Sequence, residues 1–150
     1  MWPFPQESAH PMVIHFPIAL LLTGVVVDLV ALVSKRPQLH RIALWNLALG
    51  TLGAGVAVLT GLRAEDVAKH SFDIWRVIEL HKRLGISTLI LGLMTVSWRL
   101  KQRDRLTTRA RTLTVLLTAI MAGTLMWGAH LGGRLVYEFG VGGRFGASAE

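Results

Sequence analysis

The sequence predicts an all-α integral membrane protein, a four-helix bundle whose N-terminus and C-terminus both lie outside. The first observation is composition: 52% of the 150 residues are hydrophobic, and the mean hydropathy is +0.49. The second is the presence of four apolar runs of about 20 residues, the length that crosses a hydrocarbon core of about 30 Å. The third is charge, because the basic residues cluster between these runs and not along one face.

The apolar runs predict transmembrane helices at about 15–34, 42–62, 81–100 and 112–131, within a single membrane domain that covers 1–150. Buried strands would be much shorter than these runs. The third helix is expected to begin before its apolar run, because Ile74, Val77 and Ile78 recur at helical spacing ahead of His81. Asp73 is the predicted cap of that helix.

The loops predict the orientation. Lys35, Arg36 and Arg41 surround the first loop without an acid, and the third loop is also rich in arginine and lysine. Such loops stay in the cytoplasm, so the middle loop and both termini are expected outside. The formal charge of +7 is therefore a topology signal, which argues against nucleic acid as a partner. The predicted location is the lipid bilayer of the bacterial cytoplasmic (inner) membrane, crossed several times.

The absence of cysteine limits the chemistry. With no cysteine in the chain, disulfides, thiolate metal sites and covalent haem attachment are excluded. No phosphate-binding glycine loop and no triad or paired-carboxylate motif is found, which disfavours a hydrolase. Among redox functions, an electron-transfer protein with a non-covalently bound cofactor is still compatible with the sequence. Whether the chain is an enzyme stays open.

The second predicted helix is rich in small residues. Gly50, Gly53, Ala54, Ala57 and Gly61 follow at spacings of three and four, a pattern that lets helix backbones approach closely in lipid. This helix is expected to be central to the packing.

Three histidines share one predicted depth. His15 and His81 each precede a cytoplasmic basic residue by 20 positions, and His130 follows another by 19, so each lies about 30 Å above that boundary. His10 lies just above His15, whereas His40 is predicted to lie in the cytoplasmic first loop. Polar side chains at membrane depth are costly, so their clustering suggests a functional site.

Helical rotation predicts which faces point inward. Gly85, Thr88, Gly92 and Thr95 share the face of His81, and this small, polar stripe is expected to face the interior. Ala119, Gly123 and Met126 share the face of His130, which is also expected to point inward. For His15 only the depth supports an inward position.

Two cofactors fit these residues. A single b-type haem would be ligated by two of His15, His81 and His130, with Lys82, Arg83 and Arg134 pairing with its propionates. A zinc or copper ion would instead use His10, His15, His81 and His130, with Glu79 or Asp73 as a further ligand. A third hypothesis is a subunit or assembly factor without cofactor, which binds another membrane protein or a second copy of itself.

A second haem would need two histidines in the cytoplasmic half of the membrane. Only His40 is predicted there, so at most one haem is expected. Electrons would then be exchanged with quinol or a periplasmic partner at the outer face. Asp28 is the only acid within an apolar run, and its expected role is structural, in a hydrogen bond to Asn46 or to a basic residue.

Two motifs carry a resemblance to a known family. The opening HPMVIHFPIALL, which starts at His10, and the closing GAHLGGRLVYEFGVG, from Gly128 to Gly142, resemble those of bacterial four-helix membrane proteins known as a domain of unknown function. The resemblance covers nearly the whole chain and implies that His10, His15, His81 and His130 match recurrent histidines. It also implies a loose similarity to membrane cytochromes b and a redox setting.

Overall fold

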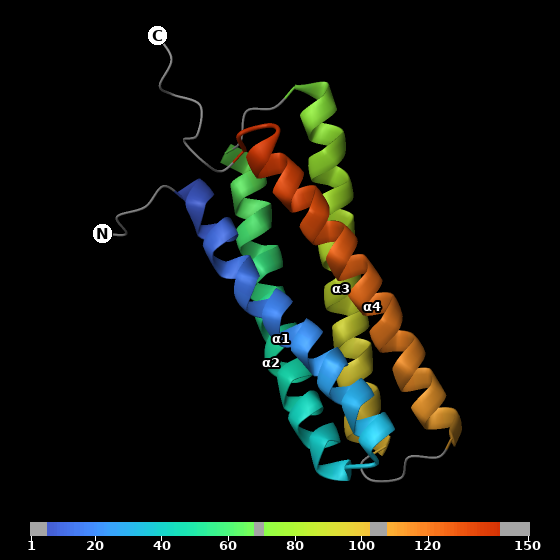
Figure 1. Cartoon of the computed structure of the whole chain (residues 1–150). Helices are drawn as coiled ribbons and strands as arrows, with labels where there is room; N and C mark the ends of the chain where they lie inside the picture. The colour runs from blue at the N-terminus through green and yellow to red at the C-terminus, as the bar shows by residue number, and fades with distance from the viewer. Residues whose placement is uncertain (1–5, 68–70, 103–107, 142–150) are drawn as a thin grey trace.

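A computed structural model describes residues 6–67, 71–102 and 108–141 of the chain. These residues form four long helices: α1 (Gln6–Ser34), α2 (Pro37–Val67), α3 (Phe72–Gln102) and α4 (Thr108–Tyr137). Within the described ranges there is no strand, which confirms the all-α prediction. The helices run alternately up and down, so α1 begins and α4 ends at the same end of the bundle (Figure 1).

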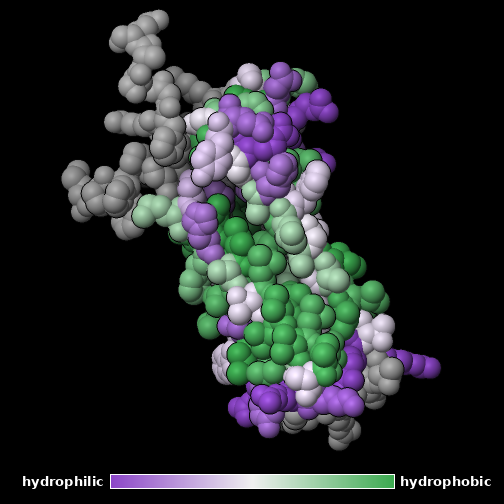
Figure 2. Space-filling view, in the orientation of Figure 1, coloured by the Kyte–Doolittle hydropathy of each residue, from purple (hydrophilic) through white to green (hydrophobic). Residues whose placement is uncertain are grey.

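Three helices are long and apolar enough to cross a membrane: His10–Ser34, Gln38–Glu65 and Arg109–Tyr137. Their exposed side chains form a broad apolar band between two polar ends (Figure 2). Helix α3 does not qualify by composition, because Lys82 and Arg83 on one side and Arg99 and Lys101 on the other closely flank its apolar stretch. Since α3 runs alongside α2 and α4 in the same bundle, its crossing of the membrane stays a prediction.

The helices are longer than the apolar runs. Helix α1 begins at Gln6, nine residues before the predicted start at His15, and α4 continues three residues past Arg134 to Tyr137. As expected, α3 begins well before its apolar run. The predicted cap is wrong, however: Asp73 lies inside the first helical turn, and the carbonyl of Ser71 accepts the amide hydrogen bond of Trp75. The glycines at 142, 143 and 146 lie outside the described residues.

The tightest seam joins α1 and α2. A Cβ atom added at Gly50 would lie 2.8 Å from Cγ of Leu21, and one at Gly24 would lie 2.9 Å from Cγ of Leu47. Each leucine is fully buried against the glycine of the other helix. The predicted central role of α2 is confirmed, because a Cβ atom at Gly53 would meet α1 at Pro17.

The face of α3 predicted to point inward does so. Thr88, Gly92 and Thr95 are buried, and Gly92 approaches α2 so closely that an added Cβ atom would lie 2.6 Å from Oγ1 of Thr51. The threonine hydroxyls along this stripe donate to carbonyls of their own helix, as that of Thr95 does to Leu91 at 2.7 Å. Their hydrogen-bonding needs are therefore met inside the bundle.

Candidate functional site

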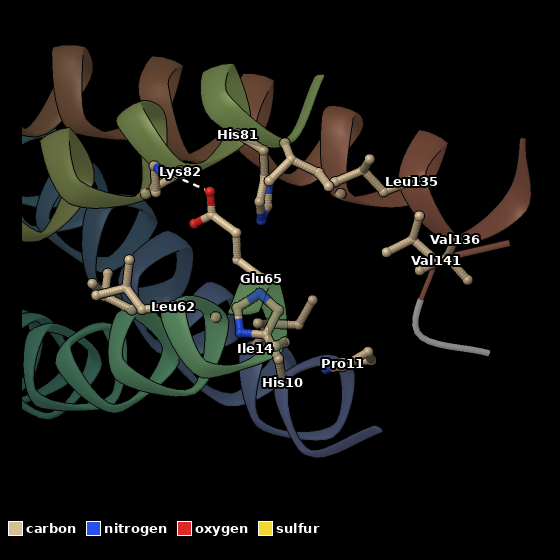
Figure 3. Close-up of a pocket in the computed structure, with 16 residues that line it drawn as sticks. His10, Pro11, Ile14, Leu62, Glu65, His81, Lys82, Leu135, Val136 and Val141 are labelled. Atoms are coloured by element: carbon tan, nitrogen blue, oxygen red, sulfur yellow. Dashed lines mark hydrogen bonds and ion pairs between the residues drawn. The ribbon is translucent and has the colours of Figure 1, made fainter. Parts of the chain in front are cut away.

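The histidines that meet are His10 on α1 and His81 on α3. Their ring centroids lie 6.0 Å apart, and the ring planes are nearly perpendicular at 79°. Figure 3 shows the two imidazoles facing each other across a pocket at the end of the bundle where α1 begins. We call this the His10 end of the bundle. It combines residues 71 positions apart in sequence, which only the antiparallel packing brings together.

Both rings are oriented through Nδ1. The Nδ1 atom of His81 donates to the carbonyl oxygen of Gly128 on α4 at 2.8 Å, so this nitrogen must carry the proton. The Nδ1 atom of His10 lies 3.2 Å from Oγ1 of Thr60 on α2, whose hydroxyl donates to carbonyls of its own helix. Thr60 therefore serves as the acceptor, and Nε2 of each neutral ring keeps a free lone pair.

Each ring packs directly on the backbone of a neighbouring helix. A Cβ atom at Gly61 on α2 would lie 3.0 Å from Cε1 of His10, and one at Gly132 on α4 would lie 3.0 Å from Cε1 of His81. Any larger residue at either position would displace the ring. The two glycines are thus part of the site. The small-residue pattern of the second helix included Gly61, but it predicted helix packing and not the placement of a ring.

Two adjoining cavities flank the histidine pair. The smaller one, about 140 Å³, is lined by both His10 and His81, and the larger one, about 440 Å³, by His15 and His81. They share Gly85 and Gly132 in their walls, and a Cβ atom at Gly85 would meet nothing within 4 Å. The walls are mainly apolar side chains from all four helices. The site can therefore hold a bulky, mostly apolar group beside the imidazoles.

Charged groups close the outer rim of the smaller cavity. The Nζ atom of Lys82 lies 2.8 Å from Oε1 of Glu65 on α2 and 2.7 Å from Oε2 of Glu79 (Figure 3 draws the first pair). Arg83 adds a third contact, 2.8 Å from Oε1 of Glu79. Hydrogen bonds from Lys82 and then Arg83 hold the pKa of Glu79 below its ordinary value. The cluster ties α2 to α3 just above the histidine pair.

The remaining predicted ligands lie elsewhere. His15 is exposed and lines only the larger cavity. His130 is exposed on α4, lines neither cavity, and packs beside Trp127 with 5.7 Å between ring centroids and the ring planes tilted by 38°. The prediction that its face points inward is wrong, since Met126 on that face is 62% exposed. Among the described residues, no group of three His, Asp or Glu could hold a metal ion.

The predicted propionate partners point away from the pair. Arg83 bonds Glu79, and Arg134 bonds Glu138 at 2.8 Å while its guanidinium lies 5.9 Å from the centroid of Phe139. Neither arginine lines a cavity, whereas Lys82 lines the smaller one. Lys82 and Arg83 share the predicted depth, but Lys82 is about 100° and Arg83 about 200° round the helix from His81, so only Lys82 comes near the face of the histidine.

A second polar cluster lies at the opposite end of the bundle. His40 belongs to the first turns of α2 and not to a loop, so that prediction is wrong. Its Nδ1 atom lies 2.7 Å from Oδ1 of Asp28 on α1, and Nη1 of Arg99 on α3 lies 3.1 Å from the same oxygen. The expected contact of Asp28 with a basic residue is confirmed, with Arg99 and His40 in place of Asn46.

These features define a class: an α-helical membrane bundle with a histidine pair enclosed near one end. The chain belongs to the family of predicted membrane proteins designated DUF2231, whose sequence model matches residues 6–144. This match shows the membrane family that the two terminal motifs resemble. It does not include a similarity to cytochromes b. No curated protein and no solved structure matches the chain.

Proposed function

We propose that this protein is a membrane electron-transfer protein that holds one b-type haem between His10 and His81. The observation that carries the proposal is the separation of the two rings. Two metal–nitrogen bonds of about 2 Å and two ring radii of about 1.2 Å give about 6.4 Å between the centroids of two imidazoles that point their Nε2 atoms at one metal from opposite sides. The rings of His10 and His81 lie 6.0 Å apart.

The ligand count favours haem over a bare zinc or copper ion. A structural zinc site takes four protein ligands and a catalytic one takes three, but no group of three His, Asp or Glu is found in the described part of the chain. A haem would bring the four nitrogens of its own macrocycle, so two histidines of the chain would be enough to hold it. When bound, it supplies one-electron redox chemistry. The same sample analysed for zinc and copper tests the alternative directly.

Residues around the two histidines would orient the imidazole rings and raise the basicity of their Nε2 atoms. The hydrogen bond from Nδ1 of His81 to Gly128 fixes the tautomer and raises the basicity of Nε2, as the second hydrogen bond of a metal-bound imidazole usually does. The contact between His10 and Thr60 does the same on the other side. Glycines at 61, 85 and 132 leave the space beside the rings free of side chains. Lys82 lines the smaller cavity, where a carboxylate of the bound group would compete with Glu65 and Glu79 for this cation.

The location proposed for this chemistry is the outer face of the bacterial cytoplasmic membrane. Lys35, Arg36 and Arg41 are at the opposite end of the bundle, where positive charge favours the cytoplasm. With a single cofactor near one face, the protein would exchange electrons with partners on that side and in the adjacent half of the bilayer.

A set of histidine variants tests the proposal. Detergent-purified wild-type protein should give a Soret band and sharp α/β bands on reduction, with about one haem per chain by pyridine haemochrome. His10→Ala and His81→Ala should each lose the haem or its six-coordinate spectrum. His130→Ala, which changes an exposed ring at the same depth, is the matched control and should keep both.

Two results would overturn the proposal. One is a colourless, iron-free wild-type protein purified from cells that make haem. The other is a normal spectrum in His10→Ala together with a lost spectrum in His130→Ala. Size-exclusion elution of each variant separates loss of haem from loss of fold.

A further inference from the structure

The larger cavity extends well beyond the histidine pair. It has a volume of about 440 Å³, and its walls run from His15 and His81 near the His10 end down to Leu21 on α1 and to Thr88 and Thr124 on α3 and α4. On α3 alone, the seven positions from His81 to Thr88 correspond to about 10 Å along the helix. The deeper part of the cavity, at Thr88 and Thr124, is therefore separated from the histidine pair by about two turns of α3.

This cavity reaches the surface beside the apolar band. Its walls include the exposed His15 of α1 and the 88% exposed Tyr137 of α4, and α1 and α4 are the least closely packed of the neighbouring helices. A molecule dissolved in the bilayer can thus enter between these two helices.

Polar groups are set into the otherwise apolar walls. The hydroxyls of Thr88 and Thr124 lie 3.0 Å apart, and each also lies 2.9 Å from a carbonyl oxygen of its own helix, that of Leu84 or Met121. Each hydroxyl has a single proton, which these contacts inside the bundle use, so the pair offers a ligand in the cavity acceptor lone pairs. The ring of His15 has no hydrogen-bond partner within the described residues. A lipid acyl chain would leave the ring of His15 without a hydrogen-bond partner.

We propose that this cavity binds a membrane-borne quinone or quinol, with its ring held between His15 and the Thr88–Thr124 pair. A quinol hydroxyl is a donor that suits the threonine acceptors, and a ring oxygen can accept from or donate to the imidazole. The flat ring and apolar tail suit an apolar space of a few hundred cubic ångströms that opens into lipid. The inference rests on the proposed function, because the haem is the electron partner of such a ligand.

Binding is measured with ubiquinone that carries a single isoprene unit, and separately with menadione, added to the purified protein in equilibrium dialysis. The wild-type protein should bind one of them saturably at about one per chain. Gly133→Leu should abolish this binding, because Gly133 lines only the larger cavity and its added Cβ meets nothing within 4 Å. Gly123→Leu is the matched control, since its Cβ is equally unhindered but lines neither cavity, and it should bind as the wild type does.

A second pair of variants tests the polar contacts. Thr88→Val combined with Thr124→Val should weaken binding about five- to tenfold, as expected for a lost hydrogen bond. Thr95→Val is the control, because Thr95 is buried on the same face of α3 and bonds only its own helix. The haem spectrum is recorded on every variant.

The outcomes separate the two proposals. Haem without saturable quinone binding, or equal binding in Gly133→Leu and Gly123→Leu, overturns the quinone site and leaves the haem proposal standing. Quinone binding that Gly133→Leu abolishes, in a protein without haem, supports the site and overturns the haem proposal alone.

Discussion

The carboxylate of Asp28 lies 2.7 Å from Nδ1 of His40, at a depth where α1 is surrounded by apolar side chains. Only 5% of Asp28 is exposed, and the same oxygen also forms an ion pair with Arg99. Arg99 completes the network by donating from Nη2 to the carbonyl oxygen of His40 at 2.8 Å. Three helices are therefore joined by one buried set of charges.

Removing only one charged residue of this network should lower the folding free energy strongly. Asp28→Ala leaves the buried guanidinium of Arg99 without its counter-charge, and the expected loss is about 3–5 kcal/mol of folding free energy. Thermal unfolding in detergent, followed by circular dichroism, measures the effect. The double variant Asp28→Ala with Arg99→Met removes both charges and should recover a large part of the loss. Equal melting of Asp28→Ala and the wild type would contradict the ion pair.

The glycine seam between α1 and α2 makes a second prediction. Gly50→Ala puts a Cβ atom 2.8 Å from Cγ of Leu21 and 3.0 Å from its backbone nitrogen, so a whole helix must shift. Overpacking of this kind costs about 1–3 kcal/mol. Gly123→Ala is the control, because its Cβ meets nothing and alanine is the better helix former, so stability should stay equal or rise by up to about 1 kcal/mol. If both variants melt alike, the close approach of the two helices is wrong.

The fold was largely predictable because its signals are local. Apolar run length predicted four helices, and small residues on α2 predicted a close neighbour, which proved to be α1. The face of His81 was predicted correctly, since small and polar residues mark one side of α3 clearly. The face of His130 was not, because Ala119 and Gly123 are small without being buried.

The pairing of histidines depends on tertiary contacts that spacing does not encode. His15 and His10 lie five positions apart on α1, so they point in different directions, and only the closeness of α2 at Gly61 brings the ring of His10 toward His81. The predicted depth in the membrane favoured His15 over His10 as the partner of His81. For the same reason the Asp28–His40 contact was missed, because the helix that holds His40 begins at Pro37, before the apolar run.

The ion pairs of Glu79 at the His10 end predict that the stability of the fold decreases at acidic pH. Lys82 and Arg83 hold the pKa of Glu79 below its ordinary value of 4.5, so the ion pairs stabilise the folded chain above that pH. This contribution is lost as the pH falls through the lowered pKa. The midpoint of thermal unfolding should therefore decrease between pH 6 and pH 3, and Glu79→Gln should flatten that decrease. Glu138→Gln, at an exposed ion pair within α4, is the control and should flatten it less.

The absence of cysteine allows a direct test of topology. Single cysteines at Ser71, which is exposed just before α3, and at Arg36, which is exposed between α1 and α2, report on opposite ends of the bundle. In intact bacterial cells, with the outer membrane made permeable where there is one, a charged maleimide should label Ser71→Cys and should label Arg36→Cys only after lysis. Because α3 alone falls short as a span by composition, a third cysteine at Lys101 decides whether it crosses. Protection of Lys101→Cys in intact cells would give four crossings, whereas labelling equal to that of Ser71→Cys would place both ends of α3 outside and contradict the bundle topology.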